Sequence, residues 1–362
     1  MTAGSARTRL MAVPGLAESE PCIVDLHRAS DIQPTPIRWL WPGWLARGKL
    51  HILAGAPGVA KTTIAMHLAA CITTGDPLPG GFRPTLGNVL IWSGEDDPAD
   101  TLVPRLLAAG ADLERTFFVG DAREGADVRS FDPATDIPAL AFEADAVGGA
   151  ALIVVDPIVS AVAGDSHKNG EVRRALQPLV TMADRLGAAV LGISHFSKGT
   201  AGRDPTERVT GSVAFGALSR VVLVAAKRLD ADGGADRMLA RAKSNIGPDG
   251  GGFGYAVEQV DLGDGIHASR INWGSSLEGS ARDLLSQAEA DENDAEDRRD
   301  VDSFLEHLLF CGEQSARSIY RDAEAAGYSR DQIKRAKRRL GVQAAKTGME
   351  GGWVWRLPPS QK

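Results

Sequence analysis

The sequence predicts an α/β fold with a mainly parallel central sheet, followed by a small C-terminal helical domain. Between Ile37 and Asn272, short apolar runs alternate with helical patterns, which is the order of elements in α/β domains. The first four apolar runs are continuous rather than alternating, as expected for parallel strands that are covered on both faces. An acidic segment then separates this region from a second group of apolar stripes, and it predicts a domain boundary.

Length and composition are those of a globular protein with one large and one small domain. The chain has 362 residues, of which 43% are hydrophobic and 24% are charged, and this excludes wholesale disorder, collagen and coiled coil. The formal net charge is −7, which excludes a uniformly basic nucleic-acid coat but still allows a local basic patch.

Cysteine usage and hydropathy point to the cytoplasm. Cys22, Cys71 and Cys311 lie far apart and form no CxxC pair, which argues against a disulfide framework and against a cysteine zinc site. No apolar run reaches the ~18 residues of a membrane span, and the first residues lack the apolar stretch of a secretory signal. We therefore expect a soluble cytoplasmic protein with no membrane partner.

The strands of the expected sheet follow the apolar runs along the chain, and they lie at 49–54, 88–92, 151–156, 188–193, 220–226, 237–242 and 253–259. Helices fit between them. After Lys61, for example, Ile64, Leu68 and Ile72 share one helical face.

Composition also sets the expected domain boundaries. Residues 1–35 are polar and lack a clear period, so we expect a loosely ordered arm. The α/β domain is expected over 36–278. Acidic residues dominate the following segment, which predicts a solvated linker over 279–300 and leaves 301–362 for the C-terminal domain.

The C-terminal domain is predicted to be a winged helix-turn-helix. Its first helix carries a clean apolar stripe that comprises Val301, Phe304, Leu305, Leu308 and Leu309. Ser329 and Gln332 form a capping box that opens the third helix. A glycine-rich turn at 348–352 then precedes an alternating strand at 353–357. Three helices followed by a β-hairpin is the element order of a winged helix.

The strongest local motif is a glycine-rich loop that follows the first apolar strand and opens an amphipathic helix. It comprises Gly55, Ala56, Pro57, Gly58, Val59, Ala60, Lys61, Thr62 and Thr63. Small residues let the backbone curl around a phosphate with its N–H groups inward, and the helix N-terminus adds positive potential. We expect Lys61 to reach the β- and γ-phosphates of ATP and the Thr62 hydroxyl to hold Mg²⁺. Ala60 stands where glycine usually precedes the lysine, and its methyl group is expected to crowd the phosphate slightly.

Asp156 is the expected partner of this loop. It ends the buried run 151–156, and a carboxylate at the tip of such a strand can hold Mg²⁺ through water, as a Walker B acid does. The alternative is an ordinary aspartate that caps the following turn.

Glu95 is the expected general base. Hydrolysis needs a carboxylate that polarises the attacking water, and Pro157 directly follows Asp156, so the base cannot be the neighbour of that residue. Glu95 follows the strand at 88–92, and the adjacent Asp96 and Asp97 are expected to cap the next helix.

His195 follows the strand at 188–193. A polar side chain at that strand tip can contact the γ-phosphate and report its presence to the loop that follows. The alternative is a histidine that only makes local hydrogen bonds.

Together these motifs resemble the RecA-like AAA_25 family of P-loop ATPases, the group that includes the RepA-type hexameric replicative helicases of plasmids and phages. The resemblance covers 37–259 and rests on blocks in the same order, namely GAPGVAKTT, WSGEDDP, PRLLAAGAD, LIVVDP, ISHFSKG, GSVAFGALSRVVLV and RAKSNIGP. It implies that Glu95 is the catalytic base, Asp156 the Walker B acid and His195 the switch residue.

The resemblance also implies a hexamer in which Arg220 and Lys243 act as fingers on the ATP of the neighbouring subunit. A cation that enters in trans stabilises the charge that spreads over the γ-phosphoryl group in the transition state. Asn245 stands where related helicases place an arginine, so Arg220 would carry the arginine-finger role alone. The alternative for Arg220 is an ordinary surface arginine.

Two parts of the chain predict DNA binding. The loops at 164–170 and 197–208 would face the central channel of a RecA-like ring and grip single-stranded DNA, and the second contains Lys198, Arg203 and Arg208. A mobile surface loop is the alternative.

In the C-terminal domain, cations gather on the third helix, where a winged helix carries its recognition helix for duplex DNA. They include Arg330, Lys334, Arg335, Lys337 and Arg338. The alternative is a solvated helix face in a protein-docking domain.

The sequence thus predicts an ATP-dependent DNA helicase or replication motor of a phage, plasmid or mobile element, with ATP and Mg²⁺ as cofactors. An ATP-switched DNA-binding regulator and a recombinase-like filament ATPase are the two alternatives. Ring closure separates the ring from the filament, and the sequence does not show it.

Overall fold

The computed structural model describes residues 24–162, 168–197, 200, 202–209, 213–228, 235–310, 312–346 and 353–358, with the backbone alone for 289–299 and 325. Residues 1–36 form one unit and residues 37–362 a second unit. The described part of the first unit is irregular apart from a short 3₁₀ helix, η1 (Ala29–Asp31), and it exposes Val24 and Leu26.

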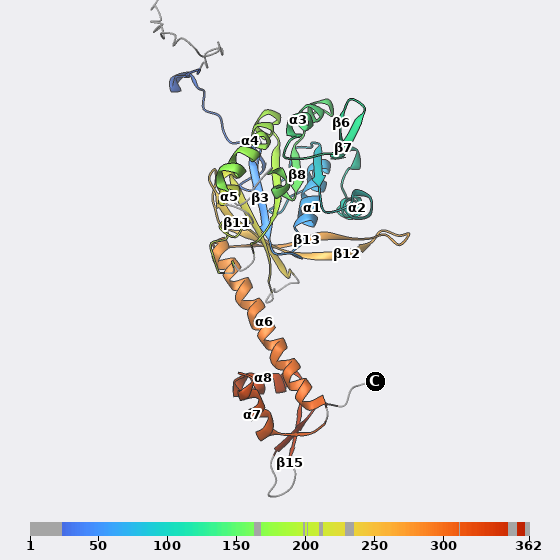
Figure 1. Ribbon diagram of the computed structural model, residues 1–362, viewed down its shortest axis with the longest axis vertical. Helices are drawn as coiled ribbons and strands as arrows, with labels where there is room; N and C mark the ends of the chain where they lie inside the picture. The colour runs from blue at the N-terminus through green and yellow to red at the C-terminus, as the bar shows by residue number, and fades with distance from the viewer. Residues whose placement is uncertain are drawn as a thin grey trace, which may run out of the picture. The chain divides into compact units, whose positions relative to one another are not determined.

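The second unit is built on a large mixed sheet. Among the described residues, nine strands form this sheet in the order β13-β12-β11-β10-β3-β9-β8-β4-β5. Figure 1 labels β3, β8, β11, β12 and β13 of this sheet. Their bounds are β3 (Leu50–Gly55), β4 (Val89–Ser93), β5 (Thr116–Phe118), β8 (Leu152–Asp156), β9 (Ala189–His195), β10 (Val221–Lys227), β11 (Arg237–Ser244), β12 (Gly252–Asp261) and β13 (His267–Leu277). The strands from β10 to β5 pair in parallel, and β11, β12 and β13 add to β10 in antiparallel fashion. The predicted α/β core with a mainly parallel sheet is therefore confirmed.

Helices cover both faces of the sheet. The helices α1 (Lys61–Thr74) and α2 (Val103–Ala108) pack on one face, whereas α3 (Ile137–Ala146), α4 (Asn169–Leu186), α5 (Val213–Leu218) and the first turns of α6 (Ala281–Phe310) pack on the other. Successive side chains of one strand pack on opposite faces of the sheet. In β8, Leu152 and Val154 join the α1 side, and Ile153 and Val155 join the α4 side. This double coverage explains why the parallel strands are continuously apolar.

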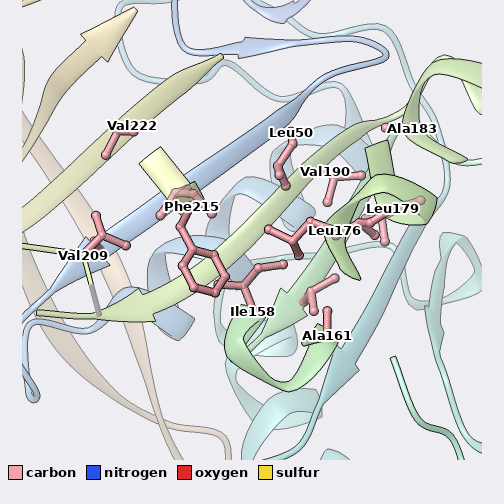
Figure 2. Close-up of a cluster of buried hydrophobic side chains, with 14 of the residues drawn as sticks. Leu50, Ile158, Ala161, Leu176, Leu179, Ala183, Val190, Val209, Phe215 and Val222 are labelled. Atoms are coloured by element: carbon pink, nitrogen blue, oxygen red, sulfur yellow. The ribbon is translucent and has the colours of Figure 1, made fainter. Parts of the chain in front are cut away.

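Figure 2 shows the core on the α4 side of the sheet. Phe215 of α5, Leu176 of α4 and Ile158 converge there over the strands. A Cβ atom on Gly192 of β9 would lie only 2.7 Å from Cγ1 of Ile158, so this strand position needs glycine. The close approach fixes the segment that follows Asp156 against β9.

Smaller elements connect these layers. Two hairpins are formed by β1 (Trp39–Trp41) with β2 (Leu45–Ala46) and by β6 (Asp121–Glu124) with β7 (Asp127–Ser130). The short helical segments are η2 (Pro98–Leu102), η3 (Leu113–Arg115) and η4 (Ile158–Ala161).

The C-terminal residues have a core of their own. The end of α6 packs with α7 (Ala316–Ala325), α8 (Arg330–Arg339) and a sheet in the order β14-β16-β15, whose strands are β14 (Gln314–Ser315), β15 (Gln343–Lys346) and β16 (Trp353–Arg356). Leu305, Ile319, Ile333 and Trp355 are buried in this core. The predicted capping box of Ser329 with Gln332 is present at the start of α8.

The structure replaces the expected linker with a helix. α6 runs without interruption from Ala281 to Phe310, across most of the segment 279–300. Its first turns bury Leu284 and Leu285 in the core of the large domain, and its last turns bury Leu305 and Leu309 in the C-terminal core. The acidic composition conceals this helix because the apolar stripe is interrupted between these two buried ends. In the described ranges, every helix is either too short or too polar to cross a bilayer.

Candidate nucleotide-binding site

The carboxyl ends of the parallel strands bring the predicted site residues to one edge of the sheet. In the strand register, Gly55 of β3 lies beside His195 of β9, and Ser93 of β4 lies beside Asp156 of β8. The glycine-rich loop, Asp156, His195 and the segment after Ser93 therefore share this edge. In open α/β sheets, ligands bind in the crevice outside these carboxyl ends.

The loop has the backbone needed for a phosphate cradle. A Cβ atom on Gly55 would collide with the carbonyl oxygen of Ala225 on β10, so the first position needs glycine. Gly58 has φ +77°, a left-handed conformation that glycine adopts without strain. α1 begins at Lys61, and no described side chain caps its N-terminus. Its first N–H groups are therefore open to an anion.

Ala60 adopts a conformation that is unusual for alanine. Its φ is 63° and its ψ is 38°, in the left-handed helical region. This accounts for the usual glycine at the position before the lysine, since the left-handed conformation costs a residue with a Cβ atom about 1–2 kcal/mol. The sequence predicted only that the methyl group of Ala60 would crowd the phosphate. The structure shows that alanine at this position also has an unfavourable backbone conformation.

Lys61 points back into the loop. Its Nζ donates to the carbonyl oxygens of Gly55 and Ala56, both at 3.0 Å, and lies 3.2 Å from Nδ1 of His195. The side chain is buried, and burial lowers its pKa, while the nearby charges of Asp156 and Glu95 oppose this shift. A buried ammonium group inside the loop is available to polyphosphate oxygens.

Thr62 and Asp156 form the pair expected for Mg²⁺. The Thr62 hydroxyl donates to Oδ2 of Asp156 at 2.8 Å. Asp156 is only 3% exposed, and burial raises its pKa to about 6, with a smaller contribution from the charge of Glu95 and an opposing one from Thr62. A hydroxyl and a carboxylate are oxygen ligands that Mg²⁺ prefers, and a cation would offset the desolvation of Asp156.

These two residues fit a metal that is shared with the nucleotide. Over the described residues, no group of three or more His, Cys, Asp or Glu side chains is arranged to hold a metal. Magnesium commonly takes one or two protein ligands and completes its shell with phosphate oxygens and water. Thr62 and Asp156 would hold Mg²⁺ in this way, and the ion would neutralise charge on the phosphates.

Glu95 stands apart from the two acidic residues that follow it. Asp97 accepts a hydrogen bond from the N–H of Ala99 at 2.7 Å and caps η2. Asp96 does not cap a helix but accepts a hydrogen bond from Nη1 of Arg105 at 2.7 Å. The side chain of Glu95 is 53% exposed, and its Oε1 lies 4.0 Å from Nε2 of His195. The geometry therefore favours Glu95 over Asp96 and Asp97 as the general base.

Sequence analysis missed Arg105. This residue lies on α2 and anchors the loop that carries Glu95 through the ion pair with Asp96. Its presence in the block PRLLAAGAD was a signal, but nothing in the sequence identified its partner.

His195 lies between Lys61 and Glu95. Burial lowers its pKa, and the charge of Lys61 acts in the same direction, so the imidazole is neutral at pH 7. Because Lys61 donates to Nδ1, the ring proton belongs on Nε2, which faces Glu95. Lys61 and His195 are in hydrogen-bond contact next to the phosphate loop, and Glu95 lies 4.0 Å beyond the imidazole.

The proposed finger residues lie at the opposite edge of the sheet. β10 is parallel to β3, with Val221 beside His51 and Ala225 beside Gly55, so Arg220, five residues before Ala225, is separated from the loop by about 16 Å of strand. Arg220 is exposed, and Lys243 donates to the carbonyl oxygen of Gly216 at 2.7 Å. Burial lowers the pKa of Lys243, and Arg220 adds to this effect. The structure does not bring either cation to the nucleotide site of its own chain.

The predicted DNA-contact residues of the large domain have different environments. Lys198 and most of the loop at 164–170 lie outside the described residues. Arg203 is exposed. Arg208 is only 7% exposed, and its guanidinium lies 4.3 Å from the centre of the Phe196 ring. The expectation of Arg208 as a surface DNA contact is wrong for this conformation because its cation is stacked on an aromatic face.

The cations of α8 also divide into two groups. Arg330 and Lys337 lie over the rings of Tyr320 and Trp355, at 5.4 and 4.4 Å from the ring centres. Lys334, Arg335 and Arg338 are exposed on one side of the helix, with Arg338 four and three residues after the other two, and Lys334 also pairs with Asp331 at 3.2 Å. These three cations are accessible to a phosphate backbone, whereas Arg330 and Arg339, which are also exposed, lie over Tyr320 and pair with Asp302, respectively.

Comparison with known families agrees with this geometry. The family model AAA_25, described as an AAA domain, matches residues 17–201, slightly more than half of the chain. The chain therefore belongs to this family of AAA-type P-loop ATPases. The match includes Lys61, Glu95, Asp156 and His195, whereas Arg220 lies beyond it. No curated protein sequence matches the chain.

Proposed function

We propose that the chain is an ATP-driven motor that acts on DNA, as a replicative helicase or closely related replication ATPase of a phage, plasmid or mobile element. In this proposal, ATP is hydrolysed at the interfaces of a homo-oligomeric ring of six subunits. The separation of the nucleotide residues from Arg220 is the observation that carries the proposal, because it leaves each site without a finger from its own chain.

The residues at the carboxyl edge supply the chemistry of hydrolysis. Lys61 would hold the β- and γ-phosphates, with Thr62 and Asp156 on Mg²⁺. Glu95 would take a proton from the attacking water. His195 would sense the γ-phosphate because it contacts Lys61 and lies 4.0 Å from Glu95.

A neighbouring subunit would complete the site. The exposed Arg220, with Lys243 behind it, would approach the γ-phosphate of the next subunit and stabilise the charge of the transition state. Lys243 would first have to leave the carbonyl oxygen of Gly216. Hydrolysis would then depend on assembly, as a ring motor requires.

The C-terminal residues support a DNA-binding role. Their elements follow the order helix, strand, helix, helix, strand, strand, which is the order in a winged helix. We assign α8 as the recognition helix, with Lys334, Arg335 and Arg338 facing duplex phosphates. Single-stranded DNA would pass through the ring, where Arg203 is an exposed candidate contact.

Strand displacement tests the proposal most directly. We expect multi-turnover ATP hydrolysis that single-stranded DNA stimulates, together with separation of a forked duplex. The variant Lys61→Ala serves as the control and should do neither. Hydrolysis without displacement would support an ATP-switched regulator instead. Electron microscopy with an ATP analogue and single-stranded DNA should show closed rings, and filaments would favour a recombinase-like ATPase.

A further inference from the structure

The aromatic residue Tyr255 contacts the phosphate loop from an unexpected part of the fold. It lies on β12, in the antiparallel extension of the sheet, and it is fully buried. Its hydroxyl donates to the carbonyl oxygen of Val59 at 2.5 Å. Burial raises the pKa of this phenol, so the group remains a donor at neutral pH. No sequence motif connects these two residues, which are 196 positions apart.

The accepting carbonyl belongs to the peptide group that precedes Ala60. Rotation of this peptide plane changes ψ of Val59 and φ of Ala60 together. A flip of the plane would therefore release Ala60 from φ 63° into the ordinary region with negative φ. The flip would also turn the N–H of Ala60 by half a rotation, and inward N–H groups are what a phosphate loop offers its ligand.

The hydrogen bond opposes this flip directly. Release of the carbonyl would leave a buried acceptor and a buried hydroxyl without their partner, and an unmade buried hydrogen bond costs about 1–3 kcal/mol. The strain at Ala60 is about 1–2 kcal/mol, so the two terms are similar in size. A strained residue persists when its surroundings fix its conformation.

We propose that Tyr255 is a positioning residue that holds the phosphate loop in its binding conformation, and that this chain needs it because alanine replaces glycine at position 60. The inference rests on the proposed ATPase function. Tyr255 does not contact the nucleotide in this proposal and acts only through Val59.

A double-mutant cycle between Tyr255→Phe and Ala60→Gly tests the proposal. Tyr255→Phe keeps the ring and removes the hydroxyl. We expect it to weaken binding of a non-hydrolysable ATP analogue about tenfold, which corresponds to the loss of one buried hydrogen bond. It should raise KM while leaving kcat at saturation nearly unchanged, because Lys61 and Glu95 stay in place.

The cycle is completed in the glycine background. In Ala60→Gly, the left-handed conformation carries no Cβ penalty, so the same Tyr255→Phe change should weaken binding by no more than about twofold. Thr73→Val is the matched control, since it removes a buried hydroxyl that donates to a backbone carbonyl at the far end of α1. It should lower Tm and leave the affinity for the analogue unchanged.

The outcomes separate this proposal from the proposed function. A wild-type chain that binds no ATP would overturn both. A wild-type chain that binds ATP, with Tyr255→Phe equally weakened in the alanine and glycine backgrounds or weakened in neither, would overturn the positioning role alone. Should Tyr255→Phe fail to fold, recovery of folding in Ala60→Gly supports the role, and failure in both backgrounds shows that Tyr255 serves only the core.

Discussion

The two edges of the parallel sheet carry different kinds of charged residue. At the carboxyl edge, Lys61 and Asp156 are buried and hydrogen-bonded, and the half-buried His195 lies against Lys61. At the amino edge, Arg220 is exposed, and Lys243 is held by a backbone carbonyl.

This difference indicates which tasks one chain can perform alone. The carboxyl edge contains the groups that would bind ATP, hold Mg²⁺ and activate water. It lacks the exposed cation that lies at the other edge, about 16 Å of strand away. The comparison therefore predicts a site that binds nucleotide within one subunit and hydrolyses it efficiently only between two.

The largest expected effect follows from removing the cation of the amino edge. Arg220→Ala should retain ATP binding and lose about 10³–10⁵-fold in hydrolysis rate, as arginine fingers do in related NTPases. Steady-state ATPase assays and analogue binding measure the two properties. Arg83→Ala removes an exposed arginine of the loop between α1 and β4, whose partners among the described residues are the carbonyl oxygen of Gly75 and the carboxylate of Asp76. It is the control and should hydrolyse ATP at the wild-type rate.

Mixing experiments show whether Arg220 acts in trans. In rings that contain both Arg220→Ala and Glu95→Gln subunits, some interfaces combine an intact Glu95 with an intact Arg220. Activity should therefore rise above that of either variant alone. Absence of rescue at every mixing ratio would contradict a role for Arg220 at the nucleotide site of a neighbouring subunit.

A smaller loss is expected from the base at the carboxyl edge. Glu95→Gln should bind ATP and slow hydrolysis by about 10²–10⁴-fold, the usual contribution of general base catalysis. Asp96→Asn is the matched control because it changes the neighbouring carboxylate, whose partner is Arg105. It should have the weaker effect. A stronger effect of Asp96→Asn would identify Asp96 as the base.

The core of the fold was predictable because double coverage leaves a strong signal in sequence. The predicted strands at 151–156 and 188–193 correspond to β8 and β9 within two residues. β13 was not predicted, because its residues alternate irregularly between exposed and buried positions and only Ala268 and Ile271 are fully covered. The helix across the acidic segment was missed for a different reason: its two apolar ends pack in separate cores, and the acidic residues between them interrupt the apolar stripe.

The candidate site was predictable to the extent that its residues lie at strand ends. Lys61, Asp156 and His195 follow apolar runs, so parallel topology alone brings them to one edge. Contacts between distant segments have no such signal. The pairing of Arg105 with Asp96 and the stacking of Arg208 on Phe196 depend on how loops fold back, which local periodicity does not encode.

The exposed cations of α8 extend the comparison to a third region. If Lys334, Arg335 and Arg338 bind duplex phosphates, changing all three to glutamine should reduce the magnitude of the log–log salt slope by about 0.9 for each phosphate that is no longer neutralised. Fluorescence anisotropy on a duplex at several salt concentrations measures this slope. Single-stranded DNA should be affected less, since the channel loops of the motor would hold it.

A matched variant shows whether DNA binding depends on the positions of these cations or only on the total positive charge of α8. Arg339→Gln removes a neighbouring cation whose guanidinium is paired with Asp302 at 2.6 Å. It should leave the salt slope nearly unchanged. Equal effects of the triple variant on duplex and single strands, or an effect of Arg339→Gln as large as that of the triple variant, would contradict the assignment of α8 as a recognition helix.

The smallest net effect is that of low pH on the stability of the fold, because buried groups at the two edges change the free energy of unfolding in opposite directions. Near the amino edge, His51 is completely buried between the N–H of Ala46 and the carbonyl of Val190, and burial lowers its pKa to about 4. The folded state binds fewer protons here than the unfolded state, so stability is lost as pH falls from about 6.5 through about 4. At the carboxyl edge, burial raises the pKa of Asp156 to about 6, so its contribution to stability is lost as pH rises from about 4 through about 6.

Single substitutions should reveal how much Asp156 and His51 each contribute to the pH dependence of stability. In metal-free buffer, Asp156→Asn removes the opposing group, and the free energy of unfolding should fall by about 2 kcal/mol more than in the wild type between pH 7 and pH 4.5. His51→Gln should reduce the fall below that of the wild type. His67 on α1 acts in the same direction as His51, because burial lowers its pKa to about 4 as well, so some loss in acid should persist in His51→Gln. Urea titrations at the two pH values measure these differences, and equal pH dependence in all three proteins would show that the buried groups of the two edges do not titrate as their environments require.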